Sequence, residues 1–570
     1  MLSAIILALV ANSLAQNVDV KMKLLQHWDN NFEGQFCYTL THHIVGWEVI
    51  IKFDQPIKHI QQWEADWIEQ PDDTKCITEA KLVNKNYKGV HDKGEQLCLK
   101  FMANTCGSGE PSATGTLVDL TNDHQTLPPL NVKPGAQKSK YNYADVLMKS
   151  ILFYEAQRSG KLPANNRIPR RGDSALNDKG SNGEDLTGGW YDAGDNVKFN
   201  FPMAWSTTVL TWGLIQWKDA YENAGELDKI TLWLILHWRV GDGGIDHGSW
   251  TSPERMTGNR PSFKIDASSP GSDVAMETAA AMAAGSIAFQ TKDSAYSATL
   301  LTHAKQLYTF AKAHPSYYSN SVNAAAAYYK SENITDENSW GAIWLYKATS
   351  DKKYLADAEA AHIPGESWGF SWDEKIFRII LLEYNLKKKS NDKGVYLQDI
   401  KATMKAWMPG GSVPYTPKCL AFRLQWGALR YASNAAFLAL VAADLGVNPD
   451  IYRKWAISQI NYALGDTGRS FVIGFGVNPP KNPHHRGSSF PMIPAPCGWE
   501  EQQNKGPNPH TLYGALVGGP GSSDDYVDQR NDYIHNEVAC DYNAGFQSAV
   551  AGLQHLANGQ KLPTSYKTCS

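Results

Sequence analysis

The chain has 570 residues and a formal net charge of −4 at pH 7, with 42% hydrophobic and 20% charged residues. This globular composition excludes collagen, coiled coils and wholesale disorder, and the small net charge argues against a nucleic-acid partner. The length suggests one large domain and one smaller domain. The 19 Trp, 26 Tyr and 18 Phe indicate either a large aromatic core or a surface that stacks flat ligands such as sugar rings.

The first 15 residues have the features of a secretory signal peptide. An apolar run over residues 2–14 ends at the small residues Ser13 and Ala15, and it is too short to span a bilayer. No later segment reads as a membrane helix. We therefore expect a secreted, extracellular protein that begins at Gln16 and has no membrane partner.

Eight cysteines, an even number, suit the oxidising environment of secreted proteins. The spacing of these cysteines matches no zinc site. If the early and late groups do not mix, disulfides form within each group of four. The early group is Cys37, Cys76, Cys98 and Cys106, and the late group is Cys419, Cys497, Cys540 and Cys569.

Residues 16–106 are predicted to be strands, because segments such as 18–24 and 47–53 alternate apolar and polar residues or run β-branched. Residues 107–138 are rich in Gly and Pro, which is typical of a linker. From there to residue 570 the apolar residues recur with helical spacing, so we expect a large, mainly α domain over 139–570. The expected helices are 144–158, 205–217, 273–289, 298–314, 339–349, 434–445 and 544–558.

A first group of carboxylates lies in the loop 185–196. Asp192 and Asp195 stand three residues apart, after two glycines and a Trp-Tyr pair. Close carboxylates raise one another's pKa and can share one water molecule. Read alone, the loop is equally compatible with a Ca²⁺ loop or a solvated turn.

A second carboxyl group, Glu537, lies among apolar residues and two tyrosines, Tyr533 and Tyr542. Such surroundings should raise its pKa and suit a general acid. Alone, Glu537 could equally be a paired acid at a helix terminus. Together, two Asp residues and one shielded Glu provide the base and the acid that hydrolysis of a glycosidic bond requires.

At this point the chain resembles a known family. Residues 141 to about 559 are similar to glycoside hydrolase family nine, the endo-β-1,4-glucanases, through motifs that occur in the family's order. The motifs are 187–195, 197–204, 246–250, 270–275, 370–373, 426–431, 476–486 and the Glu537 segment. The resemblance implies an (α/α)₆ barrel with an open cleft.

The resemblance also assigns the catalytic roles. It makes Asp195 the general base, Asp192 the carboxylate that helps to hold the attacking water, and Glu537 the general acid of an inverting hydrolase. The Asp195 and Glu537 carboxyl groups should then be about 6.5–9.5 Å apart. Positions that contact sugars near the scissile bond fall on His247, Tyr328, His484, Arg486 and Tyr542. Positions that stack on sugars along the cleft fall on Trp250, Trp368 and Trp426.

A structural Ca²⁺ site is a further implication of the resemblance. Its carboxylates would be Asp336, Glu337 and Asp373, with backbone oxygens from the turn 331–333, and such oxygen ligands suit a hard cation. The family's usual Ser-Gly-Tyr in this turn is replaced here by residues 332–334. Asn333 also begins an Asn-X-Thr sequon, so a glycan is an alternative to the metal at this turn. No organic cofactor is implied.

Through the segments 28–32, 46–49 and 60–63, residues 16–106 resemble a family-two carbohydrate-binding module, a β-sandwich. Trp47 lies within an apolar strand and is expected in the core. A binding face with aromatic rings that stack on sugars is expected from Trp28, Trp63, Trp67 and Tyr87. Cellulose and chitin are both open as ligands, and so is a structural sandwich with no ligand.

Together these features predict a secreted, monomeric endo-β-1,4-glucanase that hydrolyses cellulose or related β-1,4-glucans. Two alternatives stay open. One is a related hydrolase of mixed-linkage glucan, xylan or chitosan, and the other is an inactive polysaccharide-binding protein. The presence of Asp192, Asp195 and Glu537 argues against the inactive protein.

Overall fold

A computed structural model describes residues 17–121, 127–130, 132, 136–232, 240–375 and 394–566. The predicted signal peptide lies outside these residues. The chain divides into two compact units: Met1–Leu127 with Ser488–Asn504, and Pro128–Gly487 with Lys505–Ser570. Among the described helices, none combines the length and the apolar character needed to cross a membrane.

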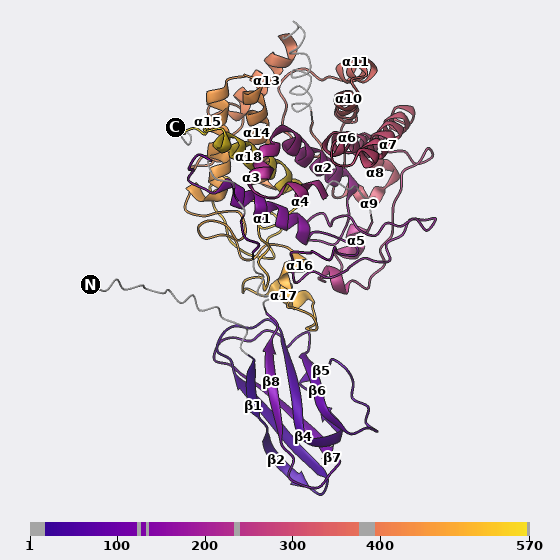
Figure 1. Ribbon diagram of the computed structural model, residues 1–570, viewed down its shortest axis with the longest axis vertical. Helices are drawn as coiled ribbons and strands as arrows, with labels where there is room; N and C mark the ends of the chain where they lie inside the picture. Colours follow the sequence, from indigo (N-terminus) through magenta and orange to yellow (C-terminus); the bar gives the residue numbers. More distant parts are fainter. Residues whose placement is uncertain are drawn as a thin grey trace, which may run out of the picture. The chain divides into compact units, whose positions relative to one another are not determined.

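The first unit is rich in strands (Figure 1), which form one eight-stranded sheet among the described residues. Its strands follow the order β1-β8-β4-β7-β3-β2, with β6 paired to β4 and β5 paired to β6. Their bounds are β1 Val18–Lys21, β2 Lys23–Trp28, β3 Asn31–Thr39, β4 Trp47–Gln62, β5 Ala65–Trp67, β6 Ile77–Asn84, β7 Gln96–Thr105 and β8 Ala113–Asp119.

The long strand β4 joins the two parts of this sheet. Its first part pairs with β6 and β8, and its last part pairs with β7. Alternate residues of β3 such as Phe32 and Phe36 point into the core, where Trp47 is also fully buried, as expected. Disulfides join Cys37 to Cys98 and Cys76 to Cys106, within the early group of cysteines.

The expected linker at 107–138 is wrong in its first part. β8 lies inside it and pairs with both β1 and β4. The strand alternates buried and half-exposed residues, with Ala113 and Leu117 in the core, so its period-2 pattern outweighs the nearby Gly and Pro.

The first unit also includes residues 488–504, which the sequence placed in the helical domain. The Met492 N–H donates to the Leu120 carbonyl at 2.9 Å, and Ala495 packs with Val83 and Leu120. Gly46 leaves room for this segment, since a Cβ there would lie 2.5 Å from the Pro491 Cβ. The boundary at 138/139 therefore does not describe this unit.

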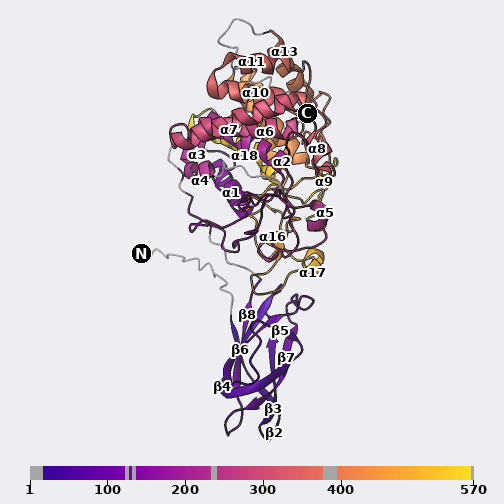
Figure 2. The same cartoon turned by 90° about the vertical axis from the view of Figure 1, so that its right-hand side faces the viewer.

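The second unit is rich in helices joined by long loops (Figures 1 and 2). Its longer helices are α1 Tyr143–Ala156, α2 Asn200–Gln216, α6 Ser272–Phe289, α7 Ser294–Ala313, α10 Thr335–Thr349, α11 Lys352–Ala360, α13 Gly394–Trp407, α14 Ala428–Asp444, α15 Pro449–Asn461 and α18 Cys540–Asn558. Its short helices are α3 Lys218–Asn223, α4 Leu227–Leu232, α5 Gly243–Asp246, α8 Tyr318–Ser321, α9 Asn323–Ala326 and α16 Arg486–Ser489.

Helices α2, α6, α14 and α18 are buried on nearly all sides, whereas α7 buries a single face. The buried helices contact one another in the series α6–α2–α18–α14, and α10 extends the series from α6. The helices α7, α11 and α15 pack outside α6, α10 and α14. Helices that are apolar all round belong inside a domain, so this unit has an inner and an outer set of helices.

The late cysteines differ from the early ones. Cys419 is disulfide-bonded, and its partner is not among the described residues. Cys497 and Cys540 are free, and Cys540 is buried at the start of α18. The within-group pairing therefore does not extend to Cys497 and Cys540.

Candidate active site

The loop that carries Asp192 and Asp195 is held by tight backbone contacts. Gly188 and Gly189 adopt positive φ values of 76° and 80°, which favour glycine. A Cβ at Gly194 would lie 2.0 Å from the His484 carbonyl oxygen, so the two chain segments meet with no space for a side chain. The Arg486 N–H donates to the Gly194 carbonyl at 2.9 Å.

The same segment brings Glu537 to this loop. His484 and Glu537 form a parallel β-bridge, and the His484 N–H donates to the Asn536 carbonyl at 2.9 Å. The Cys540 N–H, where α18 begins, donates to the Asp192 carbonyl at 2.8 Å. Three carboxylates that lie far apart in the sequence are thus gathered at one place.

Glu537 has the surroundings of a general acid. Burial raises its pKa to about 7, and the charge of Asp195 acts in the same direction. Its Oε2 accepts hydrogen bonds from the Trp426 indole N–H at 2.9 Å and from the Tyr542 hydroxyl at 3.2 Å, and both bonds oppose the rise. This carboxyl group can therefore hold a proton near neutral pH.

The two aspartates differ in exposure. Asp192 is 2% exposed, and burial, followed by the charges of Asp195 and Asp541, raises its pKa well above the usual range. Asp195 is less enclosed, and its Oδ2 lies 3.2 Å from the His247 Nε2. In turn, Asp195 raises the pKa of His247 through this hydrogen bond.

His247 and Tyr328 form one wall beside Asp195. Their rings meet edge to face at 5.3 Å, and the Tyr328 hydroxyl lies 3.4 Å from the His247 Nδ1. Both side chains are exposed. The structure thus brings these two predicted residues to Asp195.

His484 and Arg486 lie on the segment that joins the carboxylates. Burial lowers the pKa of His484 to about 4, so the imidazole is neutral, and its Nδ1 lies 2.8 Å from the Arg530 carbonyl. Because a carbonyl only accepts, Nδ1 carries the hydrogen and Nε2 is left as an acceptor. Arg486 is buried in an ion pair with Asp246.

The three predicted stacking tryptophans are placed differently. Trp368 and Trp426 are each 46% exposed and offer a ring to a ligand. Trp250 is only 3% exposed, since its ring lies against His484 and the Arg486 guanidinium. It supports these two residues in this conformation, so its expected stacking role is not seen.

The predicted metal residues lie at the start of α10 and beside it. Asp336 and Glu337 are buried, and their Oδ1 and Oε2 have no hydrogen-bond partner among the described residues. Burial raises the pKa of Asp373 to about 6. Lys375 places its Nζ 2.6 Å from the Glu337 Oε1 and compensates part of the negative charge. Orphaned buried carboxylate oxygens of this kind suit a hard cation.

These three carboxylates do not, however, gather into one ligand cluster. Among the described residues, three ligand atoms within 4.8 Å of one another come from Asp195, Asp246 and His247. The turn before α10 is closed by its own bonds: the Thr335 N–H donates to the Asn333 Oδ1 at 2.9 Å.

The predicted aromatic residues of the first unit lie at its surface. Trp28, Trp63 and Tyr87 are exposed. Trp28 is paired with Asn31, which alternates with the inward Phe32, so the Trp28 ring lies on the outer side of β2. Trp67 is half-buried and packs against the core, so it is not a full member of a surface face.

Several residues of the site were not singled out from the sequence. Asp246 forms an ion pair with Arg486. Arg430 forms a buried ion pair with Asp541 at 2.6 Å, and the charge of Asp541 acts on both Asp192 and Glu537. Tyr329 donates a hydrogen bond to Asp192. Asp246, Arg430 and Asp541 lie within quoted motifs, whereas nothing in the sequence separates Tyr329 from its neighbour Tyr328.

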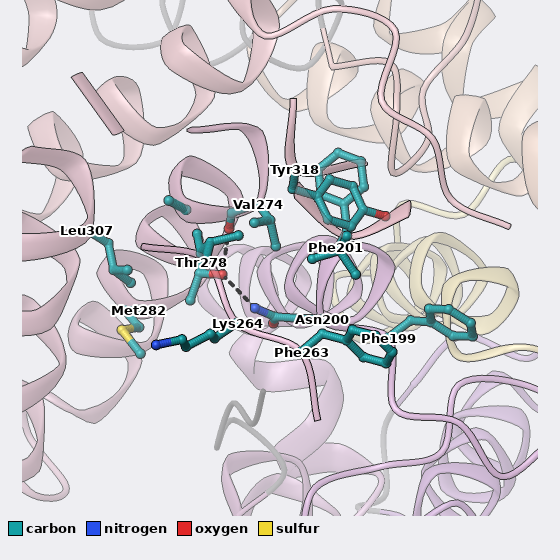
Figure 3. A pocket seen from close by; sticks show the side chains of 13 residues that line it. Phe199, Asn200, Phe201, Phe263, Lys264, Val274, Thr278, Met282, Leu307 and Tyr318 are labelled. Atoms are coloured by element: carbon teal, nitrogen blue, oxygen red, sulfur yellow. Dashed lines mark hydrogen bonds between the residues drawn. The ribbon is translucent and has the colours of Figure 1, made fainter. Parts of the chain in front are cut away.

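An apolar pocket lies next to Phe199 (Figure 3). It is lined by Phe199, Phe201 and Tyr318 on one side and by residues of α6 and α7, including Met282 and Leu307, on the other. The Phe199 ring also contacts Tyr328 and Tyr329.

A helix-rich domain in which two Asp residues and a shielded Glu are brought together is the arrangement typical of a glycoside hydrolase. Residues 143–550 match the model of Glycosyl hydrolase family 9, and the chain belongs to this family.

Curated relatives and solved structures agree with this assignment. Endoglucanase B of Cellulomonas fimi is 48% identical over 460 residues, covering 74% of this chain and 43% of that protein. Endoglucanase A of Bacillus pumilus is 45% identical over 463 residues, covering 75% and 69%. The structure of an endoglucanase from the termite Nasutitermes takasagoensis superposes with a TM-score of 0.70 at 49% identity, covering 73% of this chain and all of that one. The chain thus spans less than half of the Cellulomonas protein.

Proposed function

We propose that the protein is a secreted endo-β-1,4-glucanase that hydrolyses cellulose-type chains with inversion at the anomeric carbon. The observation that carries the proposal is the convergence of Asp192, Asp195 and Glu537 through the 484–486 segment. The relatives named above are endoglucanases. The two disulfides of the first unit support an extracellular location.

In the proposed reaction, the Asp195 carboxylate removes a proton from a water molecule as that water attacks the anomeric carbon. The Glu537 carboxyl group gives its proton to the glycosidic oxygen, and the bond to the leaving sugar breaks. Asp195 ends protonated and Glu537 ends ionised, and the new hydroxyl lies on the opposite face of the ring. The separation of about 6.5–9.5 Å between these carboxyl groups stays a prediction.

Around these groups, we propose that His247, Tyr328, His484, Arg486 and Tyr542 contact the sugar next to the scissile bond. The neutral His484 Nε2 would accept from a sugar hydroxyl. Trp368 and Trp426 would stack on sugars farther along the chain, because both rings are exposed. The inner and outer sets of helices support the (α/α)₆ barrel expected for this family.

The first test is Glu537→Gln, with activity measured as reducing-sugar release from carboxymethylcellulose. We expect a loss of about 10²–10⁴-fold, because the amide cannot donate the proton to the leaving group. Asp242→Asn, an exchange at the N-cap of α5 that asparagine tolerates, should leave the activity unchanged. Equal activity of Glu537→Gln and wild type would remove Glu537 from its role.

The anomer of the first product, read by NMR, tests the stereochemistry. We expect the α-anomer from a β-linked substrate. A β-anomer would contradict inversion. A panel with mixed-linkage glucan, xylan and chitosan defines the substrate, and activity on these but not on cellulose would contradict the cellulose proposal.

We also propose that Asp336, Glu337 and Asp373 hold a structural Ca²⁺ ion, because two of them have orphaned buried oxygens. The ion would add positive charge beside these three carboxylates, to that of Lys375. We expect Ca²⁺ at about 100 times its Kd to stabilise the fold by about 2.7 kcal/mol, measured as a rise in Tm over EDTA-treated protein. Asp336→Asn should reduce the rise, whereas Asp351→Asn, at the N-cap of α11, should keep it. An equal Tm with Ca²⁺ and with EDTA would contradict the site.

A further inference from the structure

The two oxygens of the Asp192 carboxylate differ in their hydrogen bonds. The Tyr329 hydroxyl donates to its Oδ2. Its Oδ1 is buried and has no hydrogen-bond partner in the part of the chain that the structure describes. The main chain at Asp192 is fixed as well, through its N–H to the Val197 carbonyl at 2.9 Å and its own carbonyl to the Cys540 N–H. Oδ1 is thus the oxygen left to bind another molecule.

Asp195 shows the same division between its two oxygens. Its Oδ2 faces the His247 Nε2 at 3.2 Å, and its Oδ1 is buried without a described partner. The charge of Asp195 raises the pKa of Asp192, so the two carboxylates are close together. A water molecule that donates one hydrogen to each free oxygen would present its lone pair away from them, as an attacking nucleophile must.

The ring of Tyr329 is held in place by aromatic contacts. It meets Phe199 at 5.0 Å and Trp372 at 5.0 Å, with angles of 61° and 82° between the ring planes. Phe199 itself lies at the start of α2, in the wall drawn in Figure 3. The main chain of Tyr329 is held too, because the Tyr318 hydroxyl donates to the Tyr329 carbonyl. Burial and the charge of Asp192 raise the pKa of Tyr329 well above 10, so the phenol stays protonated and remains a donor.

We propose that Tyr329 is a positioning residue of the hydrolytic reaction: its hydroxyl holds Asp192 Oδ2 so that Oδ1 faces the attacking water. The proposal rests on the function proposed above. The neighbouring Tyr328 acts in the same way on the other carboxylate, since it contacts His247, which contacts Asp195. Two consecutive tyrosines thereby orient the two carboxylates that hold the water.

The test is Tyr329→Phe, which keeps the ring contacts and removes the hydroxyl. We expect kcat to fall about 10- to 100-fold with KM nearly unchanged, because a hydrogen bond to a charged group is lost. The acidic limb of the pH profile should move to higher pH, since the lost donor stabilised the Asp192 anion. The titratable groups that face Asp192 are Asp195, Asp541, Glu537, Tyr329 and Cys540.

A matched control is Tyr143→Phe, which removes a buried tyrosine hydroxyl that donates to the neutral Asn461 Oδ1 at 2.9 Å. It should lower Tm to a similar degree and leave kcat and the pH profile unchanged. A wild-type pH profile and kcat in Tyr329→Phe, or the same losses in Tyr143→Phe, would overturn the proposal.

A double-mutant cycle separates positioning from general damage. If Tyr329 acts through Asp192, adding Tyr329→Phe to Asp192→Asn should cost no further activity. Additive losses would contradict the proposal. Failure of the proposed function is distinguishable, because it would show as a wild type that releases no sugar or as a fully active Glu537→Gln.

Discussion

At the scale of single residues, the site depends on hydrogen bonds that oppose the effect of burial on the pKa of a carboxyl group. Burial raises the pKa of Glu537, and the hydrogen bonds from Trp426 and Tyr542 lower it. Because a general acid must start protonated, activity should fall as the pH rises through about 7. Trp426 therefore has two functions in this proposal, as a stacking ring and as a donor to the acid.

Trp426→Phe separates these two functions. The phenyl ring still stacks on a sugar, but the indole N–H to Glu537 is lost. A donor to the ionised form lowers a pKa, so its loss raises the pKa of Glu537 and moves the basic limb of the kcat/KM profile to higher pH. Trp368→Phe, at a ring of equal exposure that contacts Tyr431, should leave this limb in place. An unshifted limb in Trp426→Phe would contradict the coupling.

At the scale of elements, the loops that hold the carboxylates are anchored to the ends of buried helices. The Asp192 loop leads into α2, and Glu537 stands three residues before α18. These helices contact each other, and α18 also contacts α14. The positions of the carboxylates therefore depend on close packing between helices.

Gly545→Ala tests this packing. A Cβ at Gly545 in α18 would lie 1.9 Å from the Asn434 Oδ1 in α14, and Asn434 is tied to the Phe370 carbonyl through its Nδ2 at 2.7 Å. Overpacking of this kind costs about 1–3 kcal/mol, so we expect a lower Tm in calorimetry. Gly258→Ala meets no atom within 4 Å and should leave Tm nearly unchanged. Equal Tm values for both variants would contradict close packing between α14 and α18 at Gly545.

At the scale of the whole molecule, the two units carry different surfaces. The helix-rich unit holds the carboxylates, whereas the strand-rich unit exposes Trp28, Trp63 and Tyr87. Trp63 follows β4 directly, and Trp28 lies on the outer side of β2. We propose that these rings bind an insoluble polysaccharide, since exposed aromatic rings stack on sugars.

Trp28→Ala combined with Trp63→Ala should weaken sedimentation with insoluble cellulose and leave hydrolysis of soluble carboxymethylcellulose unchanged. Each lost ring removes apolar contact area with the polymer surface. The matched control is Leu176→Ala, an exposed apolar residue of the second unit, which should keep wild-type binding. If the double variant binds cellulose as well as wild type does, the first unit is structural and these rings are not its binding face. If the protein binds chitin and not cellulose, the ligand is chitin.

Much of this protein was predictable from the sequence because local patterns recur there. Helical spacing predicted the existence of α1, α2, α6, α7, α10, α14 and α18, although α2, α7, α10, α14 and α18 begin four to six residues earlier than their apolar stripes. In α10 the first turn contains Asp336 and Glu337, which are polar and yet buried, so hydropathy misplaces its start. Motif order predicted the family, which the match over residues 143–550 confirms.

What only the tertiary structure decided is which atoms meet. The sequence determined that Asp192, Asp195 and Glu537 are present, but the partners of their oxygens come from distant segments, as Tyr329, His247 and Trp426 show. It determined an excess of Trp, but Trp250 is buried whereas Trp426 is exposed. It placed residues 488–504 in the helical domain, although they pack with β-strands. Periodicity along a chain reports which side of an element is apolar, whereas contacts between elements depend on how those sides are brought together.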